Sequence, residues 1–269
     1  MKITPIGGYS KYGYNDVQKG PKFRSCVRVY DVENKKKFAR PYILTATCFF
    51  RDCLDWKNLP EFFIKNFKDK SKVNMFCFGV SDGSEAYSYA MMIFDRFPEV
   101  LQSKFLPIWA SDIDSKVINA AKTLKINITD DDIMQKISRN IHKLSINDCF
   151  SYNSETMEIE NDQLLNNNDL AFSTYDIKKP LSESVQFECS DMTEKLSTID
   201  DDGNTIISCR NALFYMNSDY ISNFIQKLSD TLKSNSVFII GANDRIVNID
   251  KMLKDSGFTE VMENVFRRN

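Results

Sequence analysis

The chain of 269 residues is 42% hydrophobic, so it is long and apolar enough to bury a sizeable core. Its 35 basic and 37 acidic residues leave a formal net charge of −2, which gives no reason to expect a nucleic acid or an anionic membrane as partner. The seven cysteines include no C-x-x-C pair, which argues against a disulfide framework and against a zinc site.

The first part of the chain, residues 1–69, is predicted to form an arm and a helical segment. Residues 1–40 are rich in Gly, Tyr, Lys and Asn with little periodicity, which indicates an irregular arm with one strand over 27–32. A compact aromatic stretch follows over 42–52. Leu and Phe residues at helical spacing then predict an amphipathic helix over 55–67.

Residues 72–97 are typical of a strand, a small polar loop and a helix. The apolar run 73–79 has strand length, and apolar spacing predicts a helix over 85–97. Gly79 and Gly83 let the loop turn tightly, and we expect the free N–H groups of the first helical turn to face a ligand. Such a place suits an anion or a nucleoside-bearing ligand, although every α/β protein contains a strand, a turn and a helix.

A second strand is predicted over residues 106–111, and acidic residues follow it. Asp112 stands where nucleoside-binding α/β folds place the carboxylate that accepts hydrogen bonds from ribose hydroxyls. Asp114 is better explained as the N-cap of the next helix. Thr129 and the acidic residue three positions later resemble a capping box, which predicts a short helix ending at Ile137.

The rest of the chain begins with a polar, Asn-rich stretch, 138–183, which we predict to be an inserted small subdomain or long loops. The elements predicted after it are strands over 185–189, 204–209 and 236–240, a helix over 218–232, and a closing helix and strand within 247–266. Strands that alternate with helices imply a doubly wound, mainly parallel α/β sheet with its ligand at the carboxyl ends of the strands. We assign residues 70–269 to this domain.

Three separated parts of the chain resemble one family. They are T-A-T-C-F-F-R-D at 45–52, S-D-G-S-E-A-Y-S-Y-A-M at 81–91 with A-S-D-I-D at 110–114, and C-R-N-A-L-F-Y-M at 209–216. Together they resemble the chemotaxis-receptor glutamate O-methyltransferases, the CheR family. The resemblance extends from about Pro41 to the C-terminus. It implies a Rossmann-like methyltransferase domain, S-adenosylmethionine as cofactor, and a glutamate carboxylate of a partner protein, such as a chemoreceptor, as methyl acceptor.

The resemblance also implies roles for single residues. It places Thr45 and Thr47 at the methionine end of the cofactor, Gly79 and Gly83 in the loop below it, Glu85 at its ammonium group, Asp112 at its ribose, Asp191 and Met192 at its adenine, and Arg210 and Asn211 in the floor of the site. Arg51 and Tyr215 would be the catalytic residues, with Arg51 against the substrate carboxylate. Independently of the family, an arginine can bind an acidic substrate through charge-assisted hydrogen bonds.

Departures from the family pattern keep two alternatives open. The family carries an N-terminal helical domain that docks on the receptor, and the 40 residues before the aromatic motif are too few for it. Ser84, Ala86 and Asp191 stand where the family has Glu, Pro and Asn. One alternative is a methyltransferase of the same fold that acts on another side chain or on a small molecule. The other is a non-catalytic regulatory module that binds S-adenosylmethionine.

Methylation of a carboxylate fits a chain whose only histidine is His142. A carboxylate, with a reference pKa of roughly 4.3, is already ionised at neutral pH and needs no general base. Positioning and exclusion of water would supply most of the acceleration. No apolar segment approaches the length of a membrane span, and the N-terminus has no signal-peptide core. We therefore expect a cytoplasmic monomer without membrane insertion or a bound metal.

Overall fold

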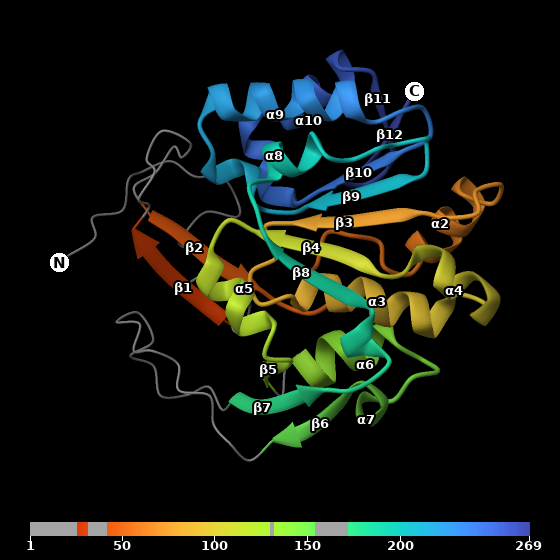
Figure 1. Ribbon diagram of the computed structural model, residues 1–269, viewed down its shortest axis with the longest axis vertical. Coiled ribbons are helices and arrows are strands. Elements are labelled where there is room, and N and C mark those ends of the chain that lie inside the picture. The colour runs from red at the N-terminus through yellow and green to blue at the C-terminus, as the bar shows by residue number, and fades with distance from the viewer. Residues whose placement is uncertain (1–25, 32–41, 130–131, 154–171) are drawn as a thin grey trace.

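The computed structural model describes residues 26–31, 42–129, 132–153 and 172–269, and its centre is a seven-stranded sheet (Figure 1). In the order in which neighbours pair, its strands are β11 (Phe258–Met262), β12 (Val265–Arg268), β10 (Val237–Ile240), β9 (Thr205–Cys209), β3 (Asn74–Phe78), β4 (Ile108–Asp112) and β8 (Val185–Cys189). The pairs from β10 to β8 are parallel, and β12 is antiparallel to both of its neighbours. The mainly parallel, Rossmann-like sheet predicted from the sequence is therefore confirmed.

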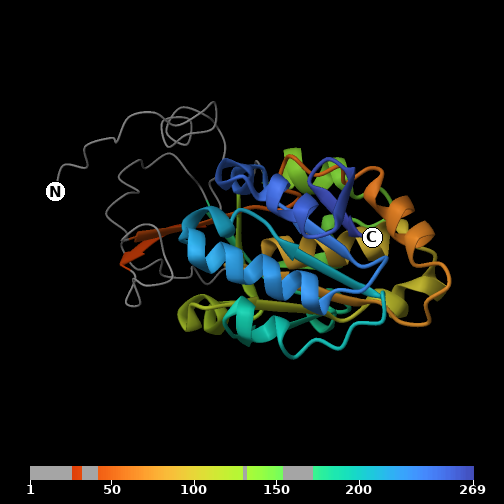
Figure 2. The ribbon, with the colours of Figure 1, turned by 90° about the horizontal axis from the view of Figure 1, so that it is seen from above.

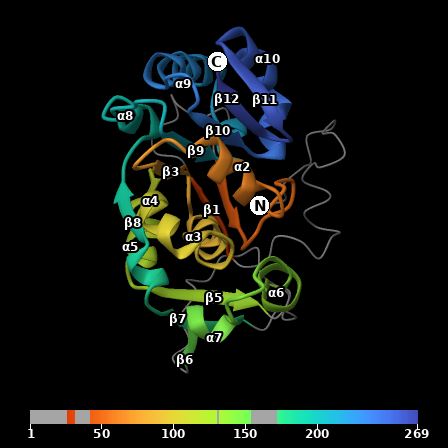
Figure 3. The same ribbon diagram turned by 90° about the vertical axis from the view of Figure 1, so that its right-hand side faces the viewer.

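Each face of the sheet packs against its own helices, because side chains alternate along a strand. Met75 and Cys77 of β3 share a buried cluster with residues of α2 (Leu59–Asn66), α3 (Ser84–Arg96) and α5 (Ser115–Ala121). Phe76 and Phe78 share another with α8 (Met192–Leu196), α9 (Ser218–Thr231) and α10 (Ile249–Asp255). Figures 2 and 3 show helices on both sides of the sheet. Within the described ranges, no helix is long and apolar enough to cross a membrane.

The order of the strands locates the ligand site. The chain runs outward from β3 to β4 and β8, then returns to pair β9 with the free side of β3 and runs outward again to β10. The connections after β3 and β9 therefore leave in opposite directions. In open α/β sheets, ligands bind beyond the carboxyl ends of the strands at such a switch point. Gly79 follows β3 and Arg210 follows β9 at this point.

A separate three-stranded antiparallel sheet stands between β4 and β8 in the chain (Figure 1). Its order is β5 (Lys125–Thr129), β7 (Phe172–Ile177) and β6 (Phe150–Asn153). A π-helix (Asp132–Ile137), α6 (Ser138–Asn140) and α7 (Ile146–Cys149) lie between β5 and β6. The short helix predicted to end at Ile137 is observed as the π-helix Asp132–Ile137, while the capping box at Thr129 stays a prediction, because residues 130–131 lie outside the described residues. The domain boundaries at 69 and 138 stay predictions.

A small sheet precedes the central one in the chain. It pairs β1 (Cys26–Asp31) with β2 (Tyr42–Thr47), and both views place it beside the carboxyl ends of the central strands (Figures 1 and 2). The strand predicted over 27–32 is therefore confirmed within one residue. The predicted arm over 1–25 and the middle of the predicted insertion, 154–171, lie outside the described residues.

Two predicted elements differ from those observed. The helix predicted from Asp55 begins at Leu59, because the Asp55 carboxylate accepts hydrogen bonds from the backbone and side-chain N–H groups of Asn58 at 3.1 and 2.7 Å and holds a turn there. The closing segment forms α10 and then the hairpin of β11 and β12, where the sequence predicted a single strand. The segment is short and polar, so the alternation of apolar and polar residues did not reveal that it contains two strands.

Candidate active site

The loop after β3 is built from left-handed backbone. Gly79, Ser81 and Gly83 have φ values of 67°, 54° and 89°. A Cβ atom on Gly83 would lie 2.7 Å from the Phe187 ring, and one on Gly79 would lie 3.0 Å from the Cβ of Ala212. Both glycines are therefore required by the fold, because a side chain at either position would be strained and crowded. Their contact with a cofactor stays a prediction.

The N–H groups of this loop are engaged by the protein itself. The N–H groups of Gly79 and Val80 donate to the Ser111 carbonyl at 2.8 and 3.2 Å, and that of Gly83 donates to the Val80 carbonyl at 3.0 Å. The N–H groups of Ser81 and Ser84 donate to carboxylates, at 3.0 Å to Asp112 Oδ2 and at 2.9 Å to Asp82 Oδ1. The expectation that the N–H groups of the first helical turn are free to face a ligand is therefore wrong for Ser84, and the four N–H groups before the helix are engaged as well. At these positions the loop gives shape to the site and offers no free donor.

Asp112 lies beside the loop, at the end of β4. Its two carboxylate oxygens accept hydrogen bonds from the N–H groups of Ser81 and Asp114, each at 3.0 Å. Burial raises the pKa of Asp112, and these two hydrogen bonds oppose that rise. Asp114 caps α5 by accepting from the Lys116 N–H, as predicted. The carboxylate expected to hold the ribose is therefore fixed next to the glycine loop, while the contact itself stays a prediction.

A buried pair of opposite charges lies where α3 meets β9. Glu85, in the first turn of α3, is 8% exposed, and Arg210 is 3% exposed. Glu85 Oε2 lies 3.6 Å from Arg210 Nη1, and Glu85 Oε1 accepts a hydrogen bond from Ser208 Oγ at 2.6 Å. The guanidinium also lies 5.7 Å from the centre of the Trp56 ring. A carboxylate and a guanidinium side by side suit the two charged groups of an amino acid.

Arg210 has unused donor capacity. Among the described residues, its Nε and Nη1 have no hydrogen-bond partner although both atoms are buried. A buried donor without an acceptor is costly, so such groups commonly meet a ligand or an ordered water. A carboxylate is the acceptor that fits a guanidinium best. The charges of Glu85 and Arg210 therefore fit the amino-acid end of S-adenosylmethionine, and the contacts themselves stay predictions.

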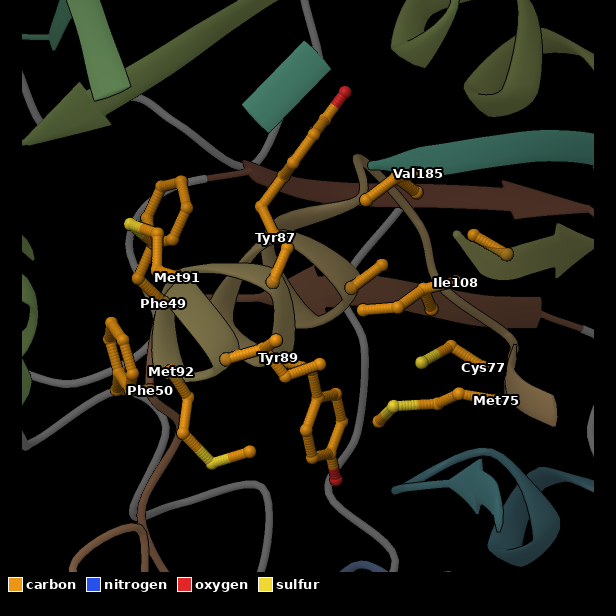
Figure 4. Packing of buried hydrophobic residues seen from close by; sticks show 14 of the residues in the cluster. Phe49, Phe50, Met75, Cys77, Tyr87, Tyr89, Met91, Met92, Ile108 and Val185 are labelled. Atoms are coloured by element: carbon orange, nitrogen blue, oxygen red, sulfur yellow. The ribbon is translucent and has the colours of Figure 1, made fainter. Parts of the chain in front are cut away.

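Two phenylalanines fix the segment that carries Arg51. Phe49 and Phe50 are buried beside Met91 and Met92 of α3 (Figure 4). The Phe50 N–H donates to Ser88 Oγ at 2.8 Å, and Phe50 has a positive φ of 42°. The chain therefore turns sharply against α3 just before Arg51. The two phenylalanines therefore anchor this segment against the main domain.

Arg210 also clamps the backbone next to Arg51. Its Nη2 donates to the carbonyl oxygens of Arg51 and Asp52 at 3.1 and 3.0 Å, and Trp56 Nε1 donates to the Arg51 carbonyl at 3.0 Å. Burial is the main cause that lowers the pKa of Arg51, and the charge of Arg210 lowers it further while Glu85 and Tyr215 raise it. The structure therefore brings together four predicted site residues, Arg51, Glu85, Arg210 and Tyr215, which we call the ionic cluster.

The loop after β9 is held by an acid that the sequence did not single out. Asp244 is buried and accepts hydrogen bonds from the N–H groups of Asn211, Phe214 and Gly241 at 2.7, 3.1 and 2.9 Å. Asn211 has a positive φ of 55°. Burial raises the pKa of Asp244 to about 6. Asp244 follows β10 in the chain. An acidic residue that follows a buried strand was the sequence signal for Asp112, and the same signal could have identified Asp244.

The remaining predicted residues lie on neighbouring elements. Asp191 caps α8 by accepting from the Thr193 N–H at 2.9 Å, and the Tyr220 hydroxyl donates to its carboxylate at 3.1 Å. Met192 Sδ lies 3.7 Å from Cys209 Sγ at the end of β9. Thr45 and Thr47 lie in β2. Asp191 thus has a structural role of its own, and its place beside the adenine stays a prediction.

Comparison with known proteins identifies a family. Residues 45–162 and 150–262 match the family described as CheR methyltransferase, SAM binding domain. Among solved structures, magnesium protoporphyrin IX methyltransferase from Synechocystis PCC 6803 with bound SAM is 11% identical over 80% of this chain and 78% of that chain, with a TM-score of 0.38. Precorrin-6y C5,15-methyltransferase from Geobacter metallireducens GS-15 is 9% identical over 82% and 90%, with a TM-score of 0.39. At such TM-scores the assignment depends on the family match alone.

Proposed function

The chain belongs to the CheR methyltransferase family, and from this membership we propose that it methylates a glutamate carboxylate of a partner protein. The family domain binds S-adenosylmethionine, so the cofactor and the reaction class, methyl transfer, follow from membership. The acceptor is the proposed part. We further propose a chemoreceptor-like protein in the cytoplasm as partner.

The residues at the carboxyl end of the sheet fit the cofactor. In the proposal, Glu85 and Arg210 bind its amino-acid end and Asp112 binds its ribose. Bound there, S-adenosylmethionine supplies a methyl group activated by a sulfonium. The proposal also assigns Thr45, Thr47, Gly79, Gly83, Asp191, Met192 and Asn211 to its contact surface.

The ionic cluster is the observation that supports a carboxylate acceptor. The guanidiniums of Arg51 and Arg210 repel each other there, and the carboxylate of Glu85 attracts both. Such a field favours an acceptor that brings a negative charge. Arg51 is suited to hold that carboxylate through a charge-assisted and bidentate contact, with Tyr215 beside it. Because the nucleophile is already ionised, these residues need only orient it and exclude water.

The test is the chemical stability of the transferred methyl group. The purified chain is incubated with methyl-tritiated S-adenosylmethionine and a chemoreceptor cytoplasmic fragment, and the labelled product is treated with mild alkali. A glutamate methyl ester releases its label as methanol, whereas an N-methyl group keeps it. The matched control is the same fragment with its glutamates replaced by glutamines, which should take up no label.

Three outcomes decide against the proposal. Label that resists alkali, or label that persists in the glutamine control, would assign the chain to another acceptor within the same fold. Binding of S-adenosylhomocysteine without any transfer to protein or small-molecule acceptors would favour the regulatory module.

A further inference from the structure

A chain of hydrogen bonds ends on the carboxylate of Glu85. The hydroxyl of Tyr89 lies 3.0 Å from Ser208 Oγ, and Ser208 Oγ donates to Glu85 Oε1 at 2.6 Å. Ser208 has one hydroxyl hydrogen, which it gives to Glu85, so Tyr89 must be the donor to Ser208. The chain therefore runs in one direction, from Tyr89 through Ser208 to Glu85, and every hydroxyl hydrogen in it has an acceptor.

The chain lies deep in the molecule. Tyr89 and Ser208 are fully buried, and the Tyr89 ring packs against Trp56 at a centroid distance of 4.9 Å. Tyr89 leaves α3 on the side opposite to Tyr87 (Figure 4). Burial first, and then the charge of Glu85, raises the pKa of Tyr89, so the phenol keeps its proton at neutral pH. Hydrogen bonds between buried hydroxyls and a carboxylate strengthen in such surroundings.

Ser208 restrains Glu85 with respect to Arg210. The two ions stand at 3.6 Å, which is longer than a charge-assisted hydrogen bond of about 2.8 Å. Ser208 pairs with Cys77 of β3, which shares a buried cluster with α3, and the Ser208 hydroxyl holds Glu85 Oε1 on that face of the sheet. Without that contact, the carboxylate is free to close on Arg210. Each ion would then satisfy the other, and both would be less available to a ligand.

We propose that Ser208 and Tyr89 are positioning residues that hold the Glu85 carboxylate ready for the ammonium group of S-adenosylmethionine. The inference rests on the proposed contact between Glu85 and that ammonium group. It assigns a role in cofactor affinity to two hydroxyls that do not themselves touch the cofactor. The competing account is that the two hydroxyls merely satisfy each other inside the core.

Calorimetric titration with two probes separates these accounts. S-adenosylhomocysteine carries the amino-acid end, and 5′-methylthioadenosine lacks it. We expect Ser208→Ala to weaken binding of S-adenosylhomocysteine about tenfold and Tyr89→Phe about threefold, because hydrogen bonds to charged groups are worth more than neutral ones. Binding of 5′-methylthioadenosine should not change in either variant. A general effect of the mutation on the fold would instead weaken the binding of both probes by the same factor.

The matched control lies on the same strand. Thr205 of β9 is fully buried, and its hydroxyl has no hydrogen-bond partner among the described residues. Thr205→Val removes that hydroxyl with little change of shape, and binding of both probes should stay at the level of the parent. Thermal unfolding of each variant without ligand shows whether it is folded, and Tyr89→Phe carries the test if Ser208→Ala does not fold.

A double-mutant cycle completes the test. In a Glu85→Gln background, Ser208→Ala should add no further loss of S-adenosylhomocysteine affinity, because the charge it positions is gone. Unchanged affinity in folded Ser208→Ala and Tyr89→Phe, or an equal loss for both probes, would overturn the inference. If instead Glu85→Gln binds S-adenosylhomocysteine as tightly as the parent, the proposed ammonium contact fails, and the inference fails with it for that distinct reason.

Discussion

Carboxylates at the carboxyl end of the sheet are held in two different ways. Glu85 contacts side chains, since Ser208 donates to it and Arg210 lies beside it. Asp112 and Asp244 instead accept hydrogen bonds from backbone N–H groups of the loops around them. The path of the backbone is therefore nearly independent of the Glu85 carboxylate. The paths of the loops around Asp112 and Asp244, in contrast, depend on those carboxylates.

The difference predicts what a mutation will change. Loss of a backbone-held carboxylate leaves buried N–H groups without acceptors, which costs stability and moves the loop. Loss of the Arg51 or Glu85 side chain removes a charge that we propose faces the ligand, and the contacts of Arg210 with the Arg51 and Asp52 carbonyls remain. Mutations at Asp112 and Asp244 should therefore lower stability, and mutations at Arg51 and Glu85 should mainly change turnover or affinity.

Arg51 should show the largest effect on turnover. Arg210 and Trp56 hold the Arg51 carbonyl, so Arg51→Ala keeps these backbone contacts while it removes the guanidinium. Loss of an orienting group costs roughly 100-fold in rate, so we expect Arg51→Ala to lose about that much turnover. Arg51→Lys keeps the positive charge but loses the planar guanidinium that can bind a carboxylate through two hydrogen bonds, so its loss of turnover should be smaller. Cofactor titration of both variants should match the parent.

A neighbouring control sharpens this prediction. Asp52 is exposed and pairs with Lys136 at 2.9 Å on the surface, where ion pairs contribute little. Asp52→Ala should therefore leave turnover almost unchanged. Parent-like turnover in Arg51→Ala would remove the physical support for a carboxylate acceptor.

Asp244 should make stability depend on pH. Its pKa in the folded state is raised to about 6 from an ordinary value of 3.8. The folded protein therefore binds this proton more tightly than the unfolded chain does. The resulting stabilisation is fully present below about pH 4 and is lost as the pH rises through about 6. Two pKa units correspond to about 2.7 kcal/mol.

Urea unfolding of the parent and Asp244→Asn, between about pH 4 and pH 7.5, measures this effect. The unfolding free energy of the parent minus that of the variant should fall across the window and level off above about pH 7. A difference that stays constant or rises with pH would contradict the assignment.

Asp112 combines both kinds of effect. Asp112→Ala removes the acceptor of the Ser81 and Asp114 N–H groups as well as the proposed ribose contact. We expect a loss of about 1–3 kcal/mol in the free energy of S-adenosylhomocysteine binding, together with lower thermal stability. Asp114→Ala is the matched control, because it removes a helix cap worth about 1 kcal/mol without touching the ligand. Full affinity in folded Asp112→Ala would disprove the ribose assignment.

The sequence was sufficient for the elements that local pattern controls. Apolar runs of strand length located β3, β4, β9 and β10, alternation of apolar and polar residues located β8, and the acid at the end of β4 was found because its place in the fold recurs. The strand β5 was not predicted, because its five residues lie in a polar segment next to a helix signal. Its partner β7 begins more than forty residues later, so only the folded chain pairs them.

The supporting residues of the site depended on tertiary pairing. Ser208 faces Glu85 only because β9 lies beside β3, and the register of that pair cannot be derived from either segment alone. Asp244 reaches the Asn211 loop in a similar way, across from β10 to β9. Most of the predicted ligand contacts lie in the motifs of the family resemblance. Of the residues that hold them in place, Tyr89 and Arg210 lie inside these motifs, whereas Trp56, Ser208 and Asp244 lie outside them.

Glu85 gives the smallest predicted effect and the clearest contrast. As an acid in the first turn of α3, it stabilises the helix N-terminus by roughly 0.3–1 kcal/mol whether or not a ligand binds. Glu61 also lies in the first turn of its helix, as the third residue of α2, and is exposed. Glu85→Gln and Glu61→Gln should therefore lower thermal stability by similar small amounts, and only Glu85→Gln should weaken S-adenosylhomocysteine binding, by about tenfold or 1.4 kcal/mol. A large loss of stability in Glu85→Gln with unchanged affinity would place Glu85 with the carboxylates that hold the fold.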